Sequence, residues 1–172
     1  ATSKDGINWL KPNLGIFRWR GSTRNNMFLT RKHSPGDDHN QQVLHTPWEN
    51  DPQKKYKLIT FVYAANRSSR ADEGYWGSFS PDGIHWTDEA KNPVLPDRGD
   101  VGQFTWDPHK KRYMGTVKIW ATVPRREGYR RCIGTTSTKD FRKWPHPELV
   151  LVPDEIDDRM HPGRMGVQFY GL

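Results

Sequence analysis

The chain has little of what builds disulfide-bonded, helical or membrane-spanning proteins. Its single cysteine, Cys132, excludes an intrachain disulfide and any metal site made of several cysteines. It stands beside Ile133 in an apolar run, which predicts a buried free thiol. No apolar run approaches the ~20 residues that a membrane-spanning helix needs, so we expect no membrane contact. Ala and Leu are scarce, which disfavours a protein built from helices.

Other features that would identify a site or a destination are also missing. The chain does not begin with Met or with a charged segment followed by an apolar one, so we expect any signal peptide to have been removed or to lie upstream. The histidines His45, His109 and His161 are too scattered to indicate a metal site, and no motif has zinc spacing. The sequence implies no metal and no cofactor.

The net charge of +7 raises the question of nucleic-acid binding, because clustered Lys and Arg bind phosphates. Most basic residues alternate with acids instead. The densest basic stretch, Arg125, Arg126, Arg130 and Arg131, contains Glu127 and is typical of a solvated turn or a charged edge strand. Since no nucleic-acid motif is present either, we do not expect a nucleic-acid partner.

What the chain does have is aromatic residues and turns. Aromatics make up 12% of it, and 15 Gly and 13 Pro are spread along its length, which favours short strands joined by turns. A string of the form Ser-x-Asp-Gly-x-x-Trp occurs at residues 3–9 and 80–86, and a degenerate copy occurs at 138–144. Asp accepts hydrogen bonds from turn amides and Gly takes a positive φ, so each copy is expected to join two antiparallel strands.

A second string alternates with the first. Asp-Pro-x-Lys-Lys occurs at residues 51–55 and 107–111, and strand-like runs follow both copies. Asp51 and Asp107 are therefore interpreted as turn residues. The repeating unit is four antiparallel strands, present twice, at about residues 40–95 and 98–152.

Repetition of such units predicts an all-β fold, a partial β-propeller of four-stranded antiparallel blades. Residues 1–20 are interpreted as the end of an earlier blade and 165–172 as the first strand of a later one. Because 172 residues cannot close a ring of ~4 to 8 blades, we expect an incomplete propeller. The missing blades would come from the rest of a parent chain or from association. The alternative is a generic antiparallel sandwich or meander in which similar turns recur.

The repeated turns carry a family resemblance. The string Ser80 to Trp86 resembles the Asp-box of sialidases, with a spacing one residue tighter. Together with the Asp-Pro-x-Lys-Lys string and the segment Phe169-Tyr170-Gly171, it looks like the five-bladed propeller superfamily of glycoside hydrolases that includes families 32 and 43. The resemblance implies a glycosidase active on a carbohydrate and an extracellular or periplasmic location. It lies in structural turns, so it bears on fold more than on activity.

In that superfamily three acidic residues stand on the innermost strands of different blades. Glycoside cleavage needs one carboxylic acid to protonate the leaving oxygen and a carboxylate to attack the sugar or activate water. The resemblance therefore places the candidates just before each Asp-Pro hairpin. Asp100, between Gly99 and Val101, is the first candidate; the alternative is a turn-capping aspartate.

The other candidate acids are weaker. Asp38 and His39 precede the first hairpin, where they line a funnel or belong to a loop. Glu155 and Asp158 lie in the densest acidic stretch, expected to be a loop between blades that is either solvated or carries an acid. Gln168 departs from the pattern of one acid on each inner strand, because it occupies the position on the third inner strand where a carboxylate is expected.

Two functions follow from these residues. The first is a glycoside hydrolase acting on a poly- or oligosaccharide, which the positive charge suggests is acidic. The second is a non-catalytic carbohydrate-binding propeller in which Trp48, Trp106 or Trp120 stack on sugar rings. The residues expected to bind substrate are as follows: His39, Gln103, Trp106, Trp120 and Gln168.

Overall fold

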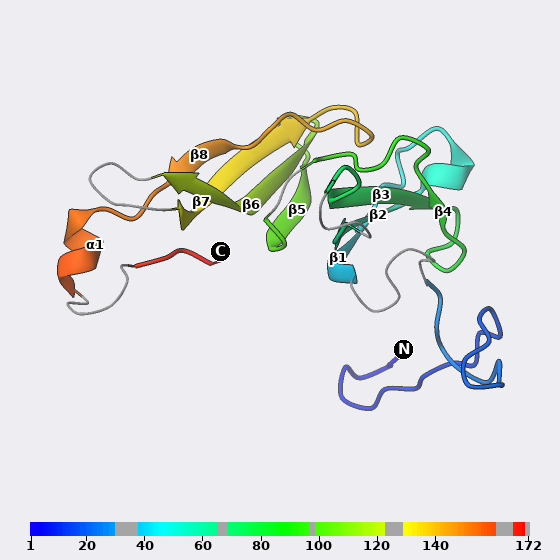
Figure 1. The fold of residues 1–172 in the computed structure, drawn as a ribbon. Helices are drawn as coiled ribbons and strands as arrows, with labels where there is room; N and C mark the ends of the chain where they lie inside the picture. The colour runs from blue at the N-terminus through cyan, green and yellow to red at the C-terminus, as the bar shows by residue number, and fades with distance from the viewer. Residues whose placement is uncertain (30–37, 65–68, 97–98, 123–128, 161–166, 171–172) are drawn as a thin grey trace.

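The computed structural model describes residues 1–29, 38–64, 69–96, 99–122, 129–160 and 167–170, and most of its regular structure is β. Two four-stranded antiparallel sheets lie side by side (Figure 1), and the strands follow chain order in each. The first sheet contains β1 (Asp38–His45), β2 (Tyr56–Val62), β3 (Gly74–Ser80) and β4 (Thr87–Asp88). The second contains β5 (Gly102–Asp107), β6 (Arg112–Thr122), β7 (Tyr129–Thr138) and β8 (Glu148–Leu151). A 3-10 turn, η1 (Pro52–Lys54), and a short helix, α1 (Glu155–Met160), complete the elements.

The two sheets match the two repeating units that the sequence predicts. Each unit contributes one complete antiparallel sheet, with both kinds of turn between its strands. No sheet closes on itself within the described residues. The all-β class and the four-stranded sheets are therefore confirmed, while their arrangement as propeller blades stays a prediction.

The Asp-Pro strings form the first turn of each sheet, as predicted. The carboxylate of Asp51 accepts a hydrogen bond from the Gln53 amide at 2.9 Å and caps η1 between β1 and β2. Asp107 accepts from the amides of His109 and Lys110, both at 2.9 Å, between β5 and β6. These hydrogen bonds hold the carboxylates in the turns.

The Ser-x-Asp-Gly strings form turns in all three places, but only two of the turns join strands. Asp82 lies between β3 and β4 and accepts from the amides two and three residues later, at 2.8 Å each. Asp140 lies between β7 and β8 and accepts from the amide two residues later at 3.0 Å. Asp5 makes the same contacts as Asp82, yet it lies inside an isolated bridge between Thr2 and Leu10. The prediction of paired strands around Asp5 is wrong, because this turn forms from local contacts that need no sheet.

One hydrophobic core joins the two sheets. Edge-to-face aromatic contacts run from Phe61 to Tyr75 in the first sheet, then to Phe104 on β5 and Trp144 between β7 and β8, with ring centroids 4.9 to 5.3 Å apart. Such contacts add to the stabilisation that burial already provides. Cys132 is fully buried in this core, as predicted, and burial raises the pKa of its thiol.

Side-chain amides connect the neighbouring strands β1 and β5. The Gln42 amide donates to the Gly102 carbonyl at 2.6 Å and accepts from the Phe104 amide at 2.7 Å, while Asn40 donates to the same carbonyl at 2.6 Å. A Cβ atom at Gly102 would lie 2.6 Å from the Tyr75 hydroxyl oxygen. The close approach of the sheets therefore requires glycine here.

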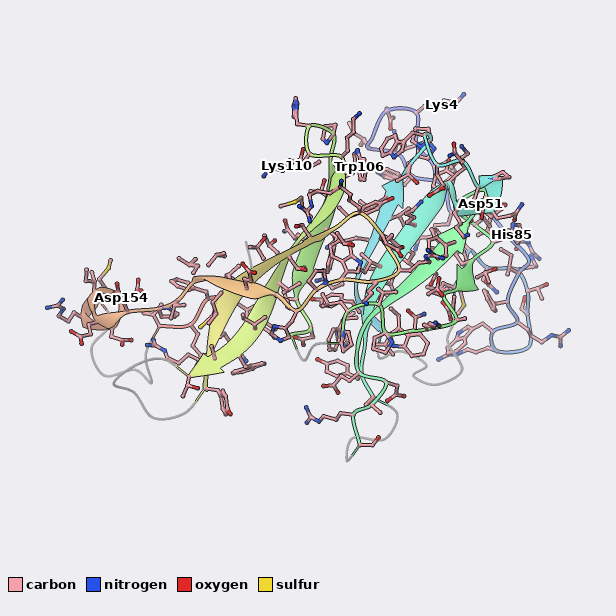
Figure 2. The ribbon with its side chains drawn as sticks, turned by 90° about the horizontal axis from the view of Figure 1, so that it is seen from above. Lys4, Asp51, His85, Trp106, Lys110 and Asp154 are labelled. Carbon is pink, nitrogen blue, oxygen red and sulfur yellow. The ribbon has the colours of Figure 1, made fainter. Side chains whose placement is uncertain are left out.

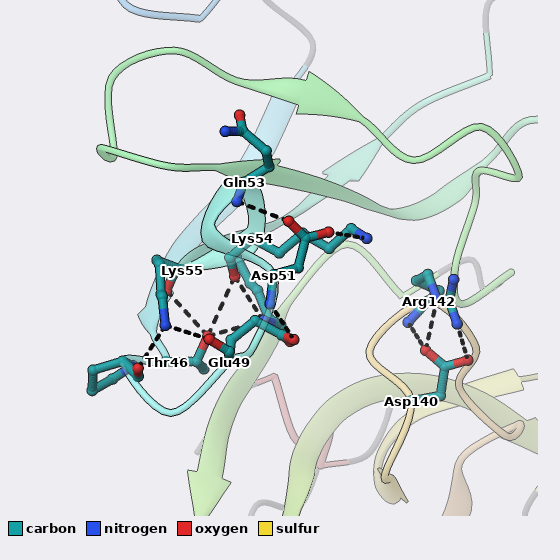
Figure 3. A network of polar contacts seen from close by, with 10 residues as sticks. Thr46, Glu49, Asp51, Gln53, Lys54, Lys55, Asp140 and Arg142 are labelled. Atoms are coloured by element: carbon teal, nitrogen blue, oxygen red, sulfur yellow. Dashed lines mark hydrogen bonds and ion pairs between the residues drawn. The ribbon is translucent and has the colours of Figure 1, made fainter.

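A buried lysine organises the turn end of the first sheet. Lys57, whose side chain is only 3% exposed, donates to Glu49 and to the Thr46 hydroxyl at 2.9 Å each. Figure 3 shows this network around Thr46 and Glu49, close to the separate exposed pair of Asp140 and Arg142. Burial lowers the pKa of Lys57, and the hydrogen bond from Lys57 lowers the pKa of Glu49. The ion pair satisfies a charge that would otherwise be costly inside the fold.

Two expectations about the later part of the chain need correction. Arg130 is not a solvated edge residue, since it is 4% exposed and forms a bidentate ion pair with Asp158 at 2.8 and 3.1 Å. Residues 125 and 126 lie outside the described residues. The acidic stretch after Pro153 contains the helix α1 where a loop was expected, because Asp154 caps it through the Ile156 amide at 2.7 Å.

The ends of the chain carry no strands in the described residues. Residues 1–29 contain only isolated bridges, so the predicted blade end is not formed there. Residues 167–170 are not a strand; 165, 166, 171 and 172 lie outside the described residues. No helix in the described part of the chain is long and apolar enough to cross a membrane.

Candidate active site

Asp100 lies where the two sheets meet, two residues before β5. The hydroxyl of Tyr75 donates to the Gly99 carbonyl at 2.7 Å, which fixes the residue before it. The Lys118 amide donates to the Val101 carbonyl at 2.7 Å, which fixes the residue after it. The backbone on both sides of Asp100 is thus held by the cores of different sheets, so the position of its side chain is set before any ligand arrives.

The carboxylate of Asp100 joins side chains from both sheets. One oxygen accepts a hydrogen bond from the hydroxyl of Tyr63, which follows β2. The other forms an ion pair with the ammonium group of Lys118 on β6. The side chain of Asp100 is 19% exposed and that of Lys118 is 4% exposed, so the carboxylate faces solvent and the ammonium does not. Unlike Asp82 or Asp107, Asp100 is coordinated by side chains that are distant in sequence.

These contacts set the protonation states of the site. Burial acts to raise the pKa of Asp100, but the hydrogen bonds from Lys118 and Tyr63 outweigh it and leave the pKa below its ordinary value. Burial, with the neighbouring Asp100 charge, raises the pKa of Tyr63 to about 12. At neutral pH the site therefore holds an ionised carboxylate and a neutral phenol that donates to it.

The first residues of β1 lie at the same end of the first sheet as Tyr63. The strand register pairs Asp38 with Val62 and His39 with Phe61. The exposed His39 ring contacts the Tyr63 ring edge-on, with centroids 5.1 Å apart. Asp38 and His39 were predicted from their place before the first hairpin, and the backbone brings both to the neighbourhood of the Asp100 partner.

The candidate acids on α1 lie elsewhere. Both views place this helix beyond the far end of the second sheet (Figures 1 and 2), where Asp154 is labelled beside it. Asp158 forms the buried ion pair with Arg130 and accepts from the Val167 amide at 3.0 Å, while Glu155 is exposed. Asp158 thus holds the residues after α1 against β7 in the described structure.

The predicted binding residues are spread over several surfaces. Gln103 is exposed on β5 and lines a groove of about 420 Å³ together with Thr105 and Thr116. Trp106 (labelled in Figure 2) points to the opposite face of the strand, where its ring packs on Trp48 at 5.2 Å.

The two remaining predicted binding residues lie near the end of β6 and near the end of the chain. Trp120 is 43% exposed, and its ring lies 5.7 Å from the Lys118 ammonium, close to the Asp100 site. Gln168 is exposed in the segment 167–170, on no strand.

Sequence reasoning missed Tyr63 and Lys118, the two partners of Asp100. A usable indication existed for Lys118. It alternates with Thr116 and Trp120 on one face of a long strand-like run, and a lysine inside such a run needs an anion when it is buried. Tyr63 gave no comparable indication, because it ends a strand that also carries other aromatics.

Within the described residues, no group of three or more His, Cys, Asp or Glu side chains is placed to hold a metal ion. Comparison of the chain with protein-family models, with curated proteins and with solved structures finds no match. No relative therefore supplies a function, and the chemistry of the site rests on its own residues.

Proposed function

We propose that this protein is a glycoside hydrolase-like propeller that acts on a poly- or oligosaccharide, with Asp100 as an ionised carboxylate of its active site. The observation that carries the proposal is the setting of Asp100. Its carboxylate is preorganised by both sheets, open to solvent and held in the charged form. Perturbed, partly open carboxylates of this kind are typical of functional sites.

The charge state of Asp100 suits one of the two roles in glycoside cleavage. Hydrolysis breaks the bond between the anomeric carbon and the leaving oxygen; the carbon gains a hydroxyl from water and the leaving oxygen gains a proton. A carboxylate that stays ionised cannot give that proton. Asp100 instead stabilises the positive charge that develops at the anomeric carbon, or attacks it.

The proton donor has to come from another group. Asp38 is the proposed second carboxyl group, because its backbone pairs with Val62 immediately before Tyr63, the partner of Asp100. The exposed Trp120 ring near Lys118 offers an apolar face on which a sugar ring can stack. Asp100 supplies the charge and Trp120 the binding surface at this junction.

A non-catalytic carbohydrate-binding propeller is the second candidate. It is favoured by the fact that both oxygens of Asp100 already accept hydrogen bonds, one from Tyr63 and one from Lys118. A catalytic carboxylate has to exchange part of this coordination for contact with the sugar. The binding candidate needs no such exchange, because the aromatic surface is sufficient for it.

The test compares Asp100→Asn with Asp107→Asn, a turn residue at the far end of the following strand β5, on a panel of polysaccharides. Asn keeps the shape of Asp and one acceptor oxygen but carries no charge. We expect turnover to fall by ~10²-fold or more in Asp100→Asn and to stay near wild type in the control. Circular dichroism at the assay temperature checks that both proteins are folded. Unchanged turnover with a lowered thermal midpoint would make Asp100 a structural ion-pair residue and favour the binding function.

A further inference from the structure

Beside the Asp100 site lies an arginine, Arg131, whose guanidinium group contacts aromatic rings. Arg131 on β7 forms no hydrogen bond or ion pair through its side chain with any described residue, and its Nε atom is shielded from solvent. Arg131 as a whole is partly buried, and a guanidinium group in such a position commonly pairs with a carboxylate or phosphate. Arg130, the preceding residue, has such a pairing with Asp158, whereas Arg131 has none among the described residues.

The contacts that Arg131 does make are with aromatic rings. Its guanidinium carbon lies 5.0 Å from the Trp120 ring centroid and 4.9 Å from that of Tyr170. The Lys118 ammonium lies 4.7 Å from the Tyr170 ring centroid, so Tyr170 contacts both cations. Trp120 and Tyr170 remain 43% and 53% exposed, which leaves part of both rings open to a ligand. Cation–π contacts hold a cation in place but do not neutralise its charge.

The segment that carries Tyr170 is fixed to the second sheet. The Phe169 amide donates to the Arg131 carbonyl at 3.0 Å, and the Val167 amide donates to Asp158 at 3.0 Å. These two hydrogen bonds hold Tyr170 next to Arg131. The ring and the guanidinium form a preorganised surface.

The local charge count favours an anionic ligand. Among the described residues, two cations, Lys118 and Arg131, share this surface with one anion, Asp100, which is paired with Lys118. One positive charge is therefore left over, and it belongs to Arg131. An anion that bound here would pair with Arg131, because Lys118 already forms an ion pair with Asp100.

We propose that Arg131 binds an anionic substituent of the saccharide, a carboxylate or a sulfate ester, while Trp120 and Tyr170 stack on its sugar rings. The substrate class is then a uronic-acid-containing or sulfated oligosaccharide. A planar guanidinium donates two parallel hydrogen bonds to either group, which a neutral hydroxyl cannot match. The inference rests on the proposed function for the position of the scissile bond near Asp100, but the binding surface itself does not depend on turnover.

The test measures binding by calorimetry with two matched pairs of probes. Oligogalacturonate and its methyl ester differ in the carboxylate; sulfated carrageenan oligosaccharides and neutral agarose oligosaccharides differ mainly in the sulfate. We expect at least one anionic probe to bind about tenfold or more tightly than its neutral counterpart, and the pair that shows the difference identifies the substituent. Arg131→Gln is expected to abolish this preference. Arg142→Gln, which removes the same charge from an exposed turn, is expected to retain it.

The failures of the two proposals are distinguishable. Asp100→Asn removes the negative charge and should bind the anionic probe as well as wild type or better, whatever its turnover. Equal binding of anionic and neutral probes, or equal effects of Arg131→Gln and Arg142→Gln, would overturn the anionic site and leave the proposed function standing. Anion binding through Arg131 without any turnover would overturn the proposed hydrolase function and leave the anionic site standing. If Arg131→Gln does not fold, Arg131→Lys keeps the charge, loses the planar pair of donors and is expected to weaken binding several-fold.

Discussion

At the scale of single residues, the Asp100 carboxylate is the shared partner of two side chains, Lys118 and Tyr63. Lys118 is almost fully buried and would be an unpaired charge without Asp100, while Tyr63 donates to the other oxygen. Removal of one partner from a buried pair costs more than the pair contributes, because the remaining charge stays desolvated. Asp100 therefore serves the fold and the proposed chemistry together.

The lowered pKa of Asp100 makes the stability of the protein depend on pH. The pKa of Asp100 is lower in the folded chain than the ordinary 3.8, so the folded state binds its proton less readily than the unfolded state does. Its contribution to stability is thus complete above about pH 5 and is lost as pH falls through the folded pKa. We expect the difference in unfolding free energy between wild type and Asp100→Asn to be constant from pH 5 to 7 and to shrink below about pH 4. Urea denaturation at each pH measures it; a difference that grows on acidification would contradict the assigned shift.

The sequence singles out Asp100 as a candidate, and it does not indicate what surrounds the side chain. The adjacent Gly99 and the position of Asp100 before a predicted inner strand are enough to single it out. Tyr63 and Lys118 lie 37 and 18 residues away in the chain, so their contact depends on how the two sheets meet. Arg130 was misjudged for the same reason, since its partner Asp158 lies 28 residues later. A run of charged residues predicts solvent exposure, because the sequence does not show when the fold places a distant acid beside one of them.

At the scale of elements, the turns within each sheet form from local hydrogen bonds, whereas the junction of β1 and β5 is formed by residues about 60 positions apart in the chain. The Asp-Pro and Ser-x-Asp-Gly strings predicted the hairpins because their hydrogen bonds lie within three residues. Asp5 shows the limit of that reasoning: its turn forms, but no strand follows, because strands need partners that a turn does not supply. The contact between β1 and β5 could not be predicted, since it rests on amide side chains.

The junction between the sheets supplies a prediction for Gln42. Gln42→Leu leaves the Phe104 amide without its acceptor in a partly buried place, while Asn40 still donates to the Gly102 carbonyl. We expect a loss of ~1 to 3 kcal/mol in the free energy of unfolding. Val43→Thr, at the neighbouring and half-exposed position, is the control and should change it by less than ~0.5 kcal/mol. Equal effects in chemical denaturation would show that the amide bridge does not hold the sheets together.

The three turn strings supply a second prediction at this scale. Each tryptophan donates its indole N–H to the carbonyl three residues earlier, at 2.9 to 3.1 Å, but Trp144 is 4% exposed and Trp9 is 60% exposed. Trp144→Ala should therefore cost ~3 to 5 kcal/mol, as expected for a large buried aromatic. Trp9→Ala, with the same local hydrogen bond, should cost much less. Similar losses in urea denaturation would mean that the N-terminal string packs on a core in solution.

At the scale of the whole molecule, large apolar side chains remain uncovered at several places. Ile7 and Leu10 are exposed in the N-terminal segment, and β8, the outer strand of the second sheet, exposes Leu149 and Val150. Exposed apolar residues on an outer strand favour association with another chain or another sheet. This exposure is consistent with the prediction of an incomplete propeller and does not depend on the family resemblance.

Association is accordingly expected. Light scattering should show a mass that rises with concentration, and Val150→Lys should reduce the effect by placing a charge on the outer strand. Gln53→Lys introduces the same charge at an exposed polar position of η1, between two strands of the first sheet, and should leave association unchanged. A compact monomer at all concentrations would show that these surfaces do not mediate contact.

If the charge of Asp100 acts on a bound sugar, an anion supplied from solution should restore activity to a variant that lacks this charge. Asp100→Ala leaves space beside the Lys118 ammonium, into which formate or azide can bind. We predict that turnover of an oligosaccharide by Asp100→Ala falls by ~10²-fold or more and recovers at least about tenfold when formate or azide is added. Asp107→Ala should show neither the loss nor the recovery. Wild-type turnover in Asp100→Ala, or no cleavage of any saccharide by the wild-type protein, would contradict the account.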